Sequence, residues 1–255
     1  MRPNKIKQMW KEGKPVTLGW LSIANSFSAE VMARQGFDAL CVDLQHGTNT
    51  MGDLIHMLQA VSQTDTVPVV RVPWNDPSTI MKALDYGAYA IIVPLVNNAA
   101  DAAAAVAACR YPPTGIRSSG PIRAQHYGGA DYLAKADGEI IVMAMIETKE
   151  GIANLDAICA TPGLDAVYIG PSDLSFALGL PPRMDNTDPL HFDTCNRILE
   201  TAHRHGKKAC MHCVSAAFAA GAIKRGFDLV MLTSDLNCMI AGARKQLDDL
   251  KAATA

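Results

Sequence analysis

The stretch EIIVMAMIETKEGIANLDAICATPGLDAVYIGPSDLSFALG, residues 139–179, sets the pattern for the whole chain. Its two apolar runs flank a helical pattern from Lys149 to about Thr161, which predicts one strand–helix–strand unit. An acid follows each predicted strand, Glu147 after the first and Asp173 after the second. If the two strands are parallel neighbours, their carboxyl ends lie at the same rim, and the two carboxylates emerge together.

Two converging carboxylates form the kind of oxygen-rich site that Mg²⁺ or Mn²⁺ prefers. The alternative is that Glu147 and Asp173 only cap the helices that follow them, as acids near helix N-termini commonly do. The spacing leaves both interpretations open.

The same alternation of strand and helix runs through the rest of the chain. Strands are predicted at 17–23, 37–43, 67–73, 89–96, 139–146, 166–170, 207–213 and 227–235, with helical patterns between them. Eight such units predict the α/β fold of a (β/α)8 TIM barrel, formed as a single domain over residues 1–255. An open doubly wound sheet is the alternative, but no G-x-G-x-x-G follows the first strand.

One segment interrupts this alternation. Residues 112–138 are predicted to form a long loop before the fifth strand, and loops of this length are often lids or interface elements.

The composition bounds the class of protein. Hydrophobic residues are 49% of 255 and the formal net charge is −2, without a basic cluster, so a nucleic-acid partner is not expected. The N-terminus lacks the apolar stretch of a signal peptide, and no run of ~18 apolar residues could span a bilayer. We therefore expect a soluble cytoplasmic protein without membrane association.

The seven cysteines are scattered through apolar runs, which favours reduced, buried thiols. Cys210 and Cys213 have the C-x-x-C spacing of a zinc or redox pair. They lie within a predicted strand, where alternate side chains face opposite ways, and this argues against such a pair.

In a TIM barrel the catalytic groups collect at the carboxyl ends of the strands. Asp43 and His46 follow the second predicted strand, Arg71 ends the third, and Asp235 follows the eighth. Each also has a simpler explanation: Arg71 could pair with Asp43, His46 could belong to a turn, and Asp235 is favoured as the cap of the last helix. Trp20 is favoured as packing at the rim of the barrel.

Five motifs together resemble a known family. They are VDLQHG at 42–47, RVPWNDP at 71–77, RYPPTGIRSSG at 110–120, MIETKEG at 145–151 and YIGPSDLS at 168–175. In this order and spacing they are similar to the HpcH/HpaI aldolase family, which includes 4-hydroxy-2-oxoheptanedioate aldolase and 2-dehydro-3-deoxyglucarate aldolase. The resemblance runs from about Thr17 to the C-terminus.

The resemblance implies a metal-dependent class II pyruvate aldolase on a pyruvate-type (β/α)8 barrel. Its cofactor would be a divalent ion, Mg²⁺, Mn²⁺ or Co²⁺, and its substrate a 4-hydroxy-2-oxo acid, such as 4-hydroxy-2-oxoheptanedioate, that is cleaved to pyruvate and an aldehyde. It also implies a homo-hexamer in which the last helix is exchanged between paired subunits.

Residue by residue, the resemblance implies that Glu147 and Asp173 are the metal ligands. Arg71 matches the arginine that holds the keto or enolate oxygen. His46 matches the catalytic base, and Asp85 matches its acidic partner, reached across a subunit contact.

The remaining candidates bind substrate or support the base. The backbone amides of Ser172 and Asp173 match those that bind the pyruvate carboxylate. Gly170 and Trp20 are further candidates for substrate contact, and Asp43 completes the candidate catalytic set.

Two positions depart from the commoner pattern of the family. Gln45 stands where Glu often precedes the histidine, and Met145 stands where Gln often precedes the metal-binding glutamate by two residues. Met145 would leave the surroundings of the metal less polar.

The aldehyde half of the substrate is expected to lie against residues 112–138 and the ends of the seventh and eighth strands. Two alternatives to the aldolase remain: a citrate-lyase-like or malyl-CoA-type lyase of the same superfamily, and a catalytically idle barrel with a binding role.

Overall fold

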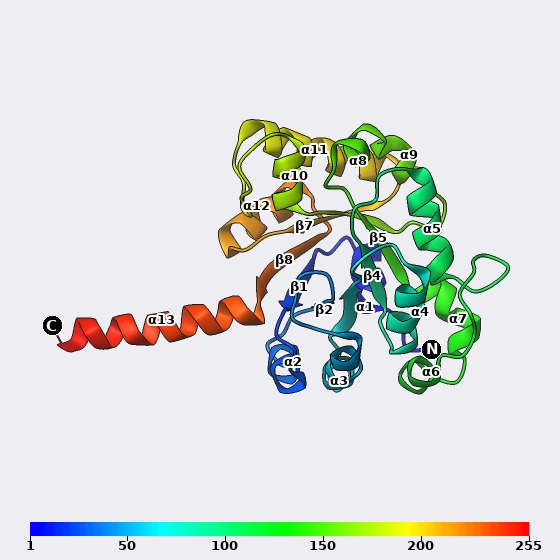
Figure 1. Ribbon diagram of the computed structural model, residues 1–255, viewed down its shortest axis with the longest axis horizontal. Helices are drawn as coiled ribbons and strands as arrows, with labels where there is room; N and C mark the ends of the chain where they lie inside the picture. The colour runs from blue at the N-terminus through cyan, green and yellow to red at the C-terminus, as the bar shows by residue number, and fades with distance from the viewer. Residues whose placement is uncertain (255) are drawn as a thin grey trace.

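The computed structural model describes residues 1–254, and these form a closed barrel of eight parallel strands in the order β1 to β8 (Figure 1). The predicted (β/α)8 fold is therefore confirmed. The strands are β1 (Val16–Leu21), β2 (Ala39–Asp43), β3 (Val67–Arg71), β4 (Ala90–Val93), β5 (Ile141–Met145), β6 (Ala166–Ile169), β7 (Lys208–His212) and β8 (Leu229–Ser234).

The helices surround the barrel and one of them closes its amino-terminal end. They are α1 (Lys5–Lys11), α2 (Ser26–Ala33), α3 (Met51–Val61), α4 (Pro77–Asp85), α5 (Ala99–Cys109), α6 (Ile122–Gly128), α7 (Tyr132–Glu139), α8 (Lys149–Ala153), α9 (Leu155–Cys159), α10 (Pro171–Ala177), α11 (Pro189–Arg204), α12 (Ala216–Arg225) and α13 (Asp235–Thr254).

Strand alternation divides the apolar residues into two cores. In β1, Leu18 and Trp20 point into the barrel, whereas Leu21 packs outward against the helices. Ile6 and Trp10 of α1 join the inner core, so this helix plugs the end of the barrel opposite the strands' carboxyl ends. A cavity opens at those carboxyl ends.

Two predicted segments differ in the structure. Residues 112–138 are not one long loop, because they include α6 and most of α7. The single helix predicted from Lys149 to Thr161 is two short helices, because the chain bends at Asn154. This residue is both the C-cap of α8 and the N-cap of α9.

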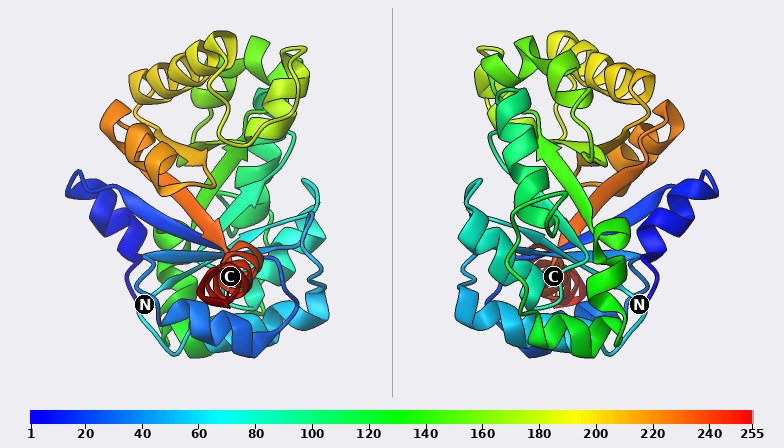
Figure 2. Two further views of the ribbon diagram at one scale, coloured as in Figure 1. Left: turned by 90° about the vertical axis from the view of Figure 1, so that its left-hand side faces the viewer. Right: turned by 90° about the vertical axis from the view of Figure 1, so that its right-hand side faces the viewer.

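The last helix projects away from the barrel (Figure 1), and Figure 2 shows it end-on. Of its residues only Asp235 is buried. Large apolar side chains along it are exposed, including Leu247 at 58% and Leu250 at 61%. This helix therefore leaves its apolar side chains uncovered by its own barrel.

Two further expectations concern the cysteines and a membrane-spanning helix. Of the seven free cysteines, all are buried except Cys238. Cys210 faces the inner core and Cys213 the outer core, as strand alternation requires, so the two do not converge. Among residues 1–254, no helix has the length and apolar character needed to cross a membrane.

Candidate active site

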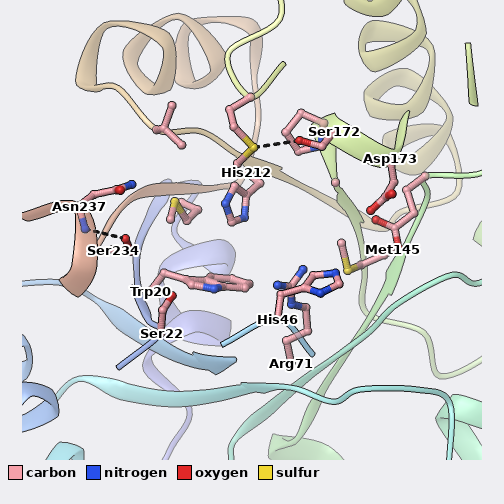
Figure 3. Close-up of a pocket in the computed structure, with 16 residues that line it drawn as sticks. Trp20, Ser22, His46, Arg71, Met145, Ser172, Asp173, His212, Ser234 and Asn237 are labelled. Atoms are coloured by element: carbon pink, nitrogen blue, oxygen red, sulfur yellow. Dashed lines mark hydrogen bonds between the residues drawn. The ribbon is translucent and has the colours of Figure 1, made fainter. Parts of the chain in front are cut away.

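A cavity of about 240 Å³ opens at the carboxyl ends of the strands (Figure 3). It is lined by ionisable groups and their neighbours, His46, Arg71, Met145, Glu147, Gly170, Pro171, Ser172 and Asp173, and by groups without charge, Trp20, Ser22, Met184, His212, Val214, Met231, Ser234 and Asn237. Figure 3 shows His46, Arg71, Met145 and Asp173 toward one side, called here the ionisable side, and Trp20, Ser22, Ser234 and Asn237 toward the other, called the uncharged side.

Strand parity places these side chains. Residues two apart on a strand face the same way, so the last inward residue of each strand stands at the floor of the cavity. Trp20 continues the inward row of Leu18, and Arg71 continues the inward row of Val69. Glu147 follows the inward Met145.

Asp43 and Arg71 form a buried ion pair across β2 and β3. Their α-carbons are direct partners in the strand register, and both side chains point inward. Nε of Arg71 donates to Oδ1 of Asp43 at 2.8 Å, and Nη2 donates to Oδ2 at 2.6 Å. Burial favours a higher pKa for Asp43, but the hydrogen bonds and charge of Arg71 outweigh it and the pKa is lowered. The carboxylate therefore stays ionised and fixes the guanidinium.

Trp20 holds the same pair from the other side. Its indole Nε1 donates to Oδ2 of Asp43 at 3.2 Å, and the guanidinium carbon of Arg71 lies 4.8 Å from the ring centroid. Nη1 of Arg71 has no hydrogen-bond partner among residues 1–254. The fixed arginine therefore keeps the N–H groups of Nη1 free for an oxygen in the cavity.

Glu147 is held by one oxygen only. The backbone N–H of Leu95 donates to Oε1 at 2.9 Å. Oε2 lies so close to Gly170 that a β-carbon added there would be 2.2 Å from it. A β-carbon at position 170 would therefore displace this oxygen, and Oε2 accepts no hydrogen bond within residues 1–254.

Glu147 and Asp173 make a suitable donor set for a divalent cation. Burial raises the pKa of Glu147 to about 7, and the charge of Asp173 adds to this, against the N–H of Leu95 and the charge of Arg71. Glu147 is 2% exposed, whereas Asp173 is exposed to the cavity. A cation would offset the charge of both carboxylates. No cluster of three or more acidic, His or Cys side chains suited to a metal occurs within residues 1–254, so the two carboxylates would leave a cation with open positions.

His46 and the first turn of α10 complete the ionisable side. His46 is exposed, and its backbone N–H donates to Oδ1 of Asp43 at 3.3 Å. The backbone N–H groups of Ser172 and Asp173 belong to the first turn of α10, where no helical carbonyl precedes them. Both N–H groups are therefore available to donate to an anionic group.

Asp85 does not line the cavity of its own chain. It ends α4, and its Oδ1 accepts from Nη2 of Arg117 at 2.8 Å. The Arg117 side chain is fully buried and also donates to the hydroxyl of Tyr132 at 3.1 Å.

Asp235 ties together two strand ends, besides standing at the start of the last helix. Its carboxylate accepts from the backbone N–H of Ser22 at 2.9 Å, of Ile23 at 3.1 Å and of Leu236 at 2.8 Å. The sequence suggested only the cap.

His212 and the residues beside it were not assigned from the sequence. The signal was present, because His212 is two residues after the inward Cys210. None of residues 112–138 lines this cavity within a single chain, because α6 packs beside α4 and α7 packs beside α6. Their expected contact with the aldehyde therefore finds no support within one chain and stays a prediction. The ends of β7 and β8 do line the cavity, through His212 and Ser234 among others.

Comparison with known proteins gives the family. Residues 17–241 match the family described as HpcH/HpaI aldolase/citrate lyase. A hydroxypyruvate/pyruvate aldolase of Rhizorhabdus wittichii is 40% identical over 249 residues, covering 98% of this chain and 99% of that protein. A 5-keto-4-deoxy-D-glucarate aldolase of Escherichia coli O157:H7 is 37% identical over 252 residues, covering 98% and 97%.

Comparison with solved structures indicates the same family. An HpcH/HpaI aldolase/citrate lyase family protein of Burkholderia cenocepacia superposes with a TM-score of 0.91 at 30% identity, covering 97% of this chain and 99% of that one. From this match, the barrel and the family motifs, we conclude that the chain belongs to the HpcH/HpaI aldolase/citrate lyase family and is a carbon–carbon lyase of the aldolase type.

Proposed function

We propose that this protein is a metal-dependent class II aldolase that reversibly cleaves a 4-hydroxy-2-oxo acid to pyruvate and an aldehyde. One arrangement carries the proposal: a guanidinium fixed by a buried carboxylate shares a cavity with two carboxylates and an exposed imidazole. A cleavage that leaves charge on a keto oxygen needs such a set of groups.

The substrate's keto acid end would lie on the ionisable side. Its carboxylate is placed at the N–H groups of Ser172 and Asp173, and its keto oxygen faces the free Nη1 of Arg71. Glu147 and Asp173 would hold Mg²⁺, Mn²⁺ or Co²⁺. Such an ion supplies Lewis-acid stabilisation of negative charge on the keto oxygen.

Cleavage requires removal of one proton. His46 takes the proton of the C4 hydroxyl, the C3–C4 bond breaks, and the aldehyde leaves. The electron pair of that bond remains on the pyruvate fragment as its enolate, whose oxygen Arg71 stabilises. Protonation of C3 then gives pyruvate.

The test separates the keto acid half from the aldehyde half. Pyruvate incubated with the protein and Mn²⁺ in D₂O should take deuterium into its methyl group, because the enolate forms without any aldehyde. The same sample should cleave 4-hydroxy-2-oxo acids with release of pyruvate. Absence of both reactions with bound metal would contradict the proposal.

We also propose that the working enzyme is a homo-oligomer, expected to be a hexamer, with α13 exchanged between paired subunits. Support comes from the apolar side chains that α13 exposes and from an apolar groove between α2 and the first turn of α13. In that assembly Asp85 would act across a subunit contact as the acidic partner of His46, with Arg117 holding it in place.

A further inference from the structure

A buried tyrosine and histidine stand beneath the uncharged side of the cavity. Tyr168 lies on β6 and His212 at the end of β7, and both point into the barrel. Oη of Tyr168 is 3.0 Å from Nδ1 of His212. The imidazole also meets the indole of Trp20 edge-on, with centroids 4.8 Å apart and planes at 78°. The ring is therefore held on two sides.

This contact fixes which nitrogen carries the proton. The hydroxyl of Tyr168 finds no acceptor other than Nδ1 of His212 among residues 1–254. A buried hydroxyl without an acceptor is costly, so Tyr168 donates to Nδ1. Burial, together with the charge of Arg71, lowers the pKa of His212 to about 3, which keeps the ring neutral. A neutral ring that accepts at Nδ1 carries its hydrogen on Nε2.

The Nε2–H group faces the cavity. His212 lines it, and Nε2 has no partner within residues 1–254. Figure 3 shows Ser172, Asp173 and Met145 on one side of His212, and Ser22, Ser234 and Asn237 on the other. The imidazole thus lies between the keto acid end and the uncharged end.

We propose that His212 is a specificity-determining residue whose Nε2–H donates to a hydroxyl on the aldehyde carbon chain, next to the carbonyl carbon. The inference rests on the proposed aldolase function. With the keto acid end at Arg71 and Ser172 and the C4 hydroxyl at His46, the rest of the carbon chain has the uncharged side of the cavity to occupy, beginning at His212. The preferred aldehyde is therefore a 2-hydroxyaldehyde, and the uncharged hydroxyl and amide groups of Ser22, Ser234 and Asn237 suit further hydroxyls.

Two substrates of nearly equal shape isolate this contact. In 4,5-dihydroxy-2-oxopentanoate a C5 hydroxyl occupies the place of a methyl group in 4-hydroxy-2-oxohexanoate. The methyl leaves the buried donor unpaired, so we expect kcat/KM to favour the hydroxyl compound by about 10- to 100-fold. In His212→Leu this ratio should fall to within about threefold of one, and in His212→Gln, whose amide nitrogen replaces Nε2, it should recover in part.

The ratio is measured within each variant, so a general loss of activity cancels. Tyr168→Phe, which keeps the shape of the barrel core, should also lower the ratio because the tautomer is no longer fixed. It serves as a second variant if His212→Leu does not fold. In the resting wild type, ¹⁵N NMR with labelled histidine should show His212 protonated at Nε2 and unprotonated at Nδ1.

The outcomes separate the two proposals. The aldolase proposal stands if deuterium exchanges into pyruvate. The role of His212 is then overturned by any of three results: a wild-type kcat/KM ratio near one, an undiminished ratio in His212→Leu, or a proton on Nδ1 of His212. If the metal-loaded enzyme catalyses neither the exchange nor the cleavage of either substrate, both proposals are overturned.

Discussion

The backbone N–H of Leu95 donates to Oε1 of Glu147 from a left-handed conformation, with φ at 54°. This is the only positive φ at a residue other than glycine within residues 1–254. Such a conformation is strained for leucine and persists where the surroundings demand it. Its effect is to turn one donor onto Glu147, so that the other carboxylate oxygen stays free beside Gly170.

Substituting Gly170 should therefore damage the candidate metal site without removing either ligand. In Gly170→Ala the new β-carbon would meet Oε2 of Glu147 at 2.2 Å and Cε of Met145 at 2.9 Å. We expect Mn²⁺ affinity, measured by titration calorimetry, to fall by about 10- to 100-fold, as when the support of a ligand is lost. The matched control is Gly138→Ala in α7, where a β-carbon meets nothing within 4 Å, and affinity should not change.

Metal removal should abolish activity reversibly. Two carboxylate ligands make an open site that a chelator can empty, so EDTA should stop both pyruvate exchange and cleavage, and Mg²⁺, Mn²⁺ or Co²⁺ should restore them. Glu147→Gln should weaken this restoration because it removes a charge from the ligand set. Full activity in protein shown by elemental analysis to be free of metal would exclude a cation at this site.

Loss of the ion pair between Asp43 and Arg71 should lower the free energy of unfolding strongly. In Asp43→Asn the guanidinium loses its charged partner within the barrel, and removal of one member of such a pair costs about 3–5 kcal/mol. The exposed pair of Asp249 and Lys245 gives the control, since Asp249→Asn should cost less than about 1 kcal/mol. Denaturant titration at pH 7 measures both.

The same pair fixes the direction of a pH effect. The pKa of Asp43 is lowered in the folded state. Its contribution is then complete above the pKa of the unfolded chain, about 3.9, and is lost as the pH falls through the folded value. The stability difference between wild type and Asp43→Asn should therefore be constant from pH 7 to pH 5 and shrink below about pH 4. A difference that grows on acidification would contradict the ion pair.

The barrel was predictable because periodicity and strand-end acids are local signals. The strand–helix–strand unit around Glu147 and Asp173 already contained the alternation that the structure repeats. The split of the helix at Asn154 was not predictable in the same way, because it depends on a hydrogen bond from the Asn154 side chain to the carbonyl of Asn97, which is distant in sequence.

The site was predictable to the extent that it is built from strand ends. Arg71 ends one apolar strand, Glu147 and Asp173 come within four residues of the ends of two others, and all three share one cavity. Strand parity alone could place His212 inward, but its proposed role depends on its contact with Tyr168, which is 44 positions away and which the sequence does not place beside it. The constraint on Gly170 is likewise a contact between two separate loops.

The last helix should be required for assembly. We expect light scattering to give a species several times the mass of one chain. Leu247→Glu combined with Leu250→Glu places charges on exposed apolar positions of α13 and should dissociate it. Lys245→Ala, on the opposite side of the helix, is the control. An active wild-type monomer would contradict both the assembly and the role proposed for Asp85.

Arg71 and His46 should fail in different ways because they are proposed to act on different atoms. Arg71 stabilises the enolate oxygen, which is charged both in cleavage and in exchange of the pyruvate methyl group. Arg71→Ala should abolish both reactions. Arg71→Lys should restore little, because an ammonium cannot donate to both oxygens of Asp43 and to the substrate with the geometry of a guanidinium.

His46 is proposed to remove the proton of the C4 hydroxyl, a group that pyruvate lacks. His46→Ala should slow cleavage by about 10²- to 10⁴-fold, the usual effect of losing a general base. Its loss of methyl exchange should be smaller. Both rates are measured for both variants at saturating Mn²⁺, with circular dichroism to verify folding. Near-normal exchange in Arg71→Ala would remove Arg71 from enolate stabilisation, and near-normal cleavage in His46→Ala would remove His46 as the base.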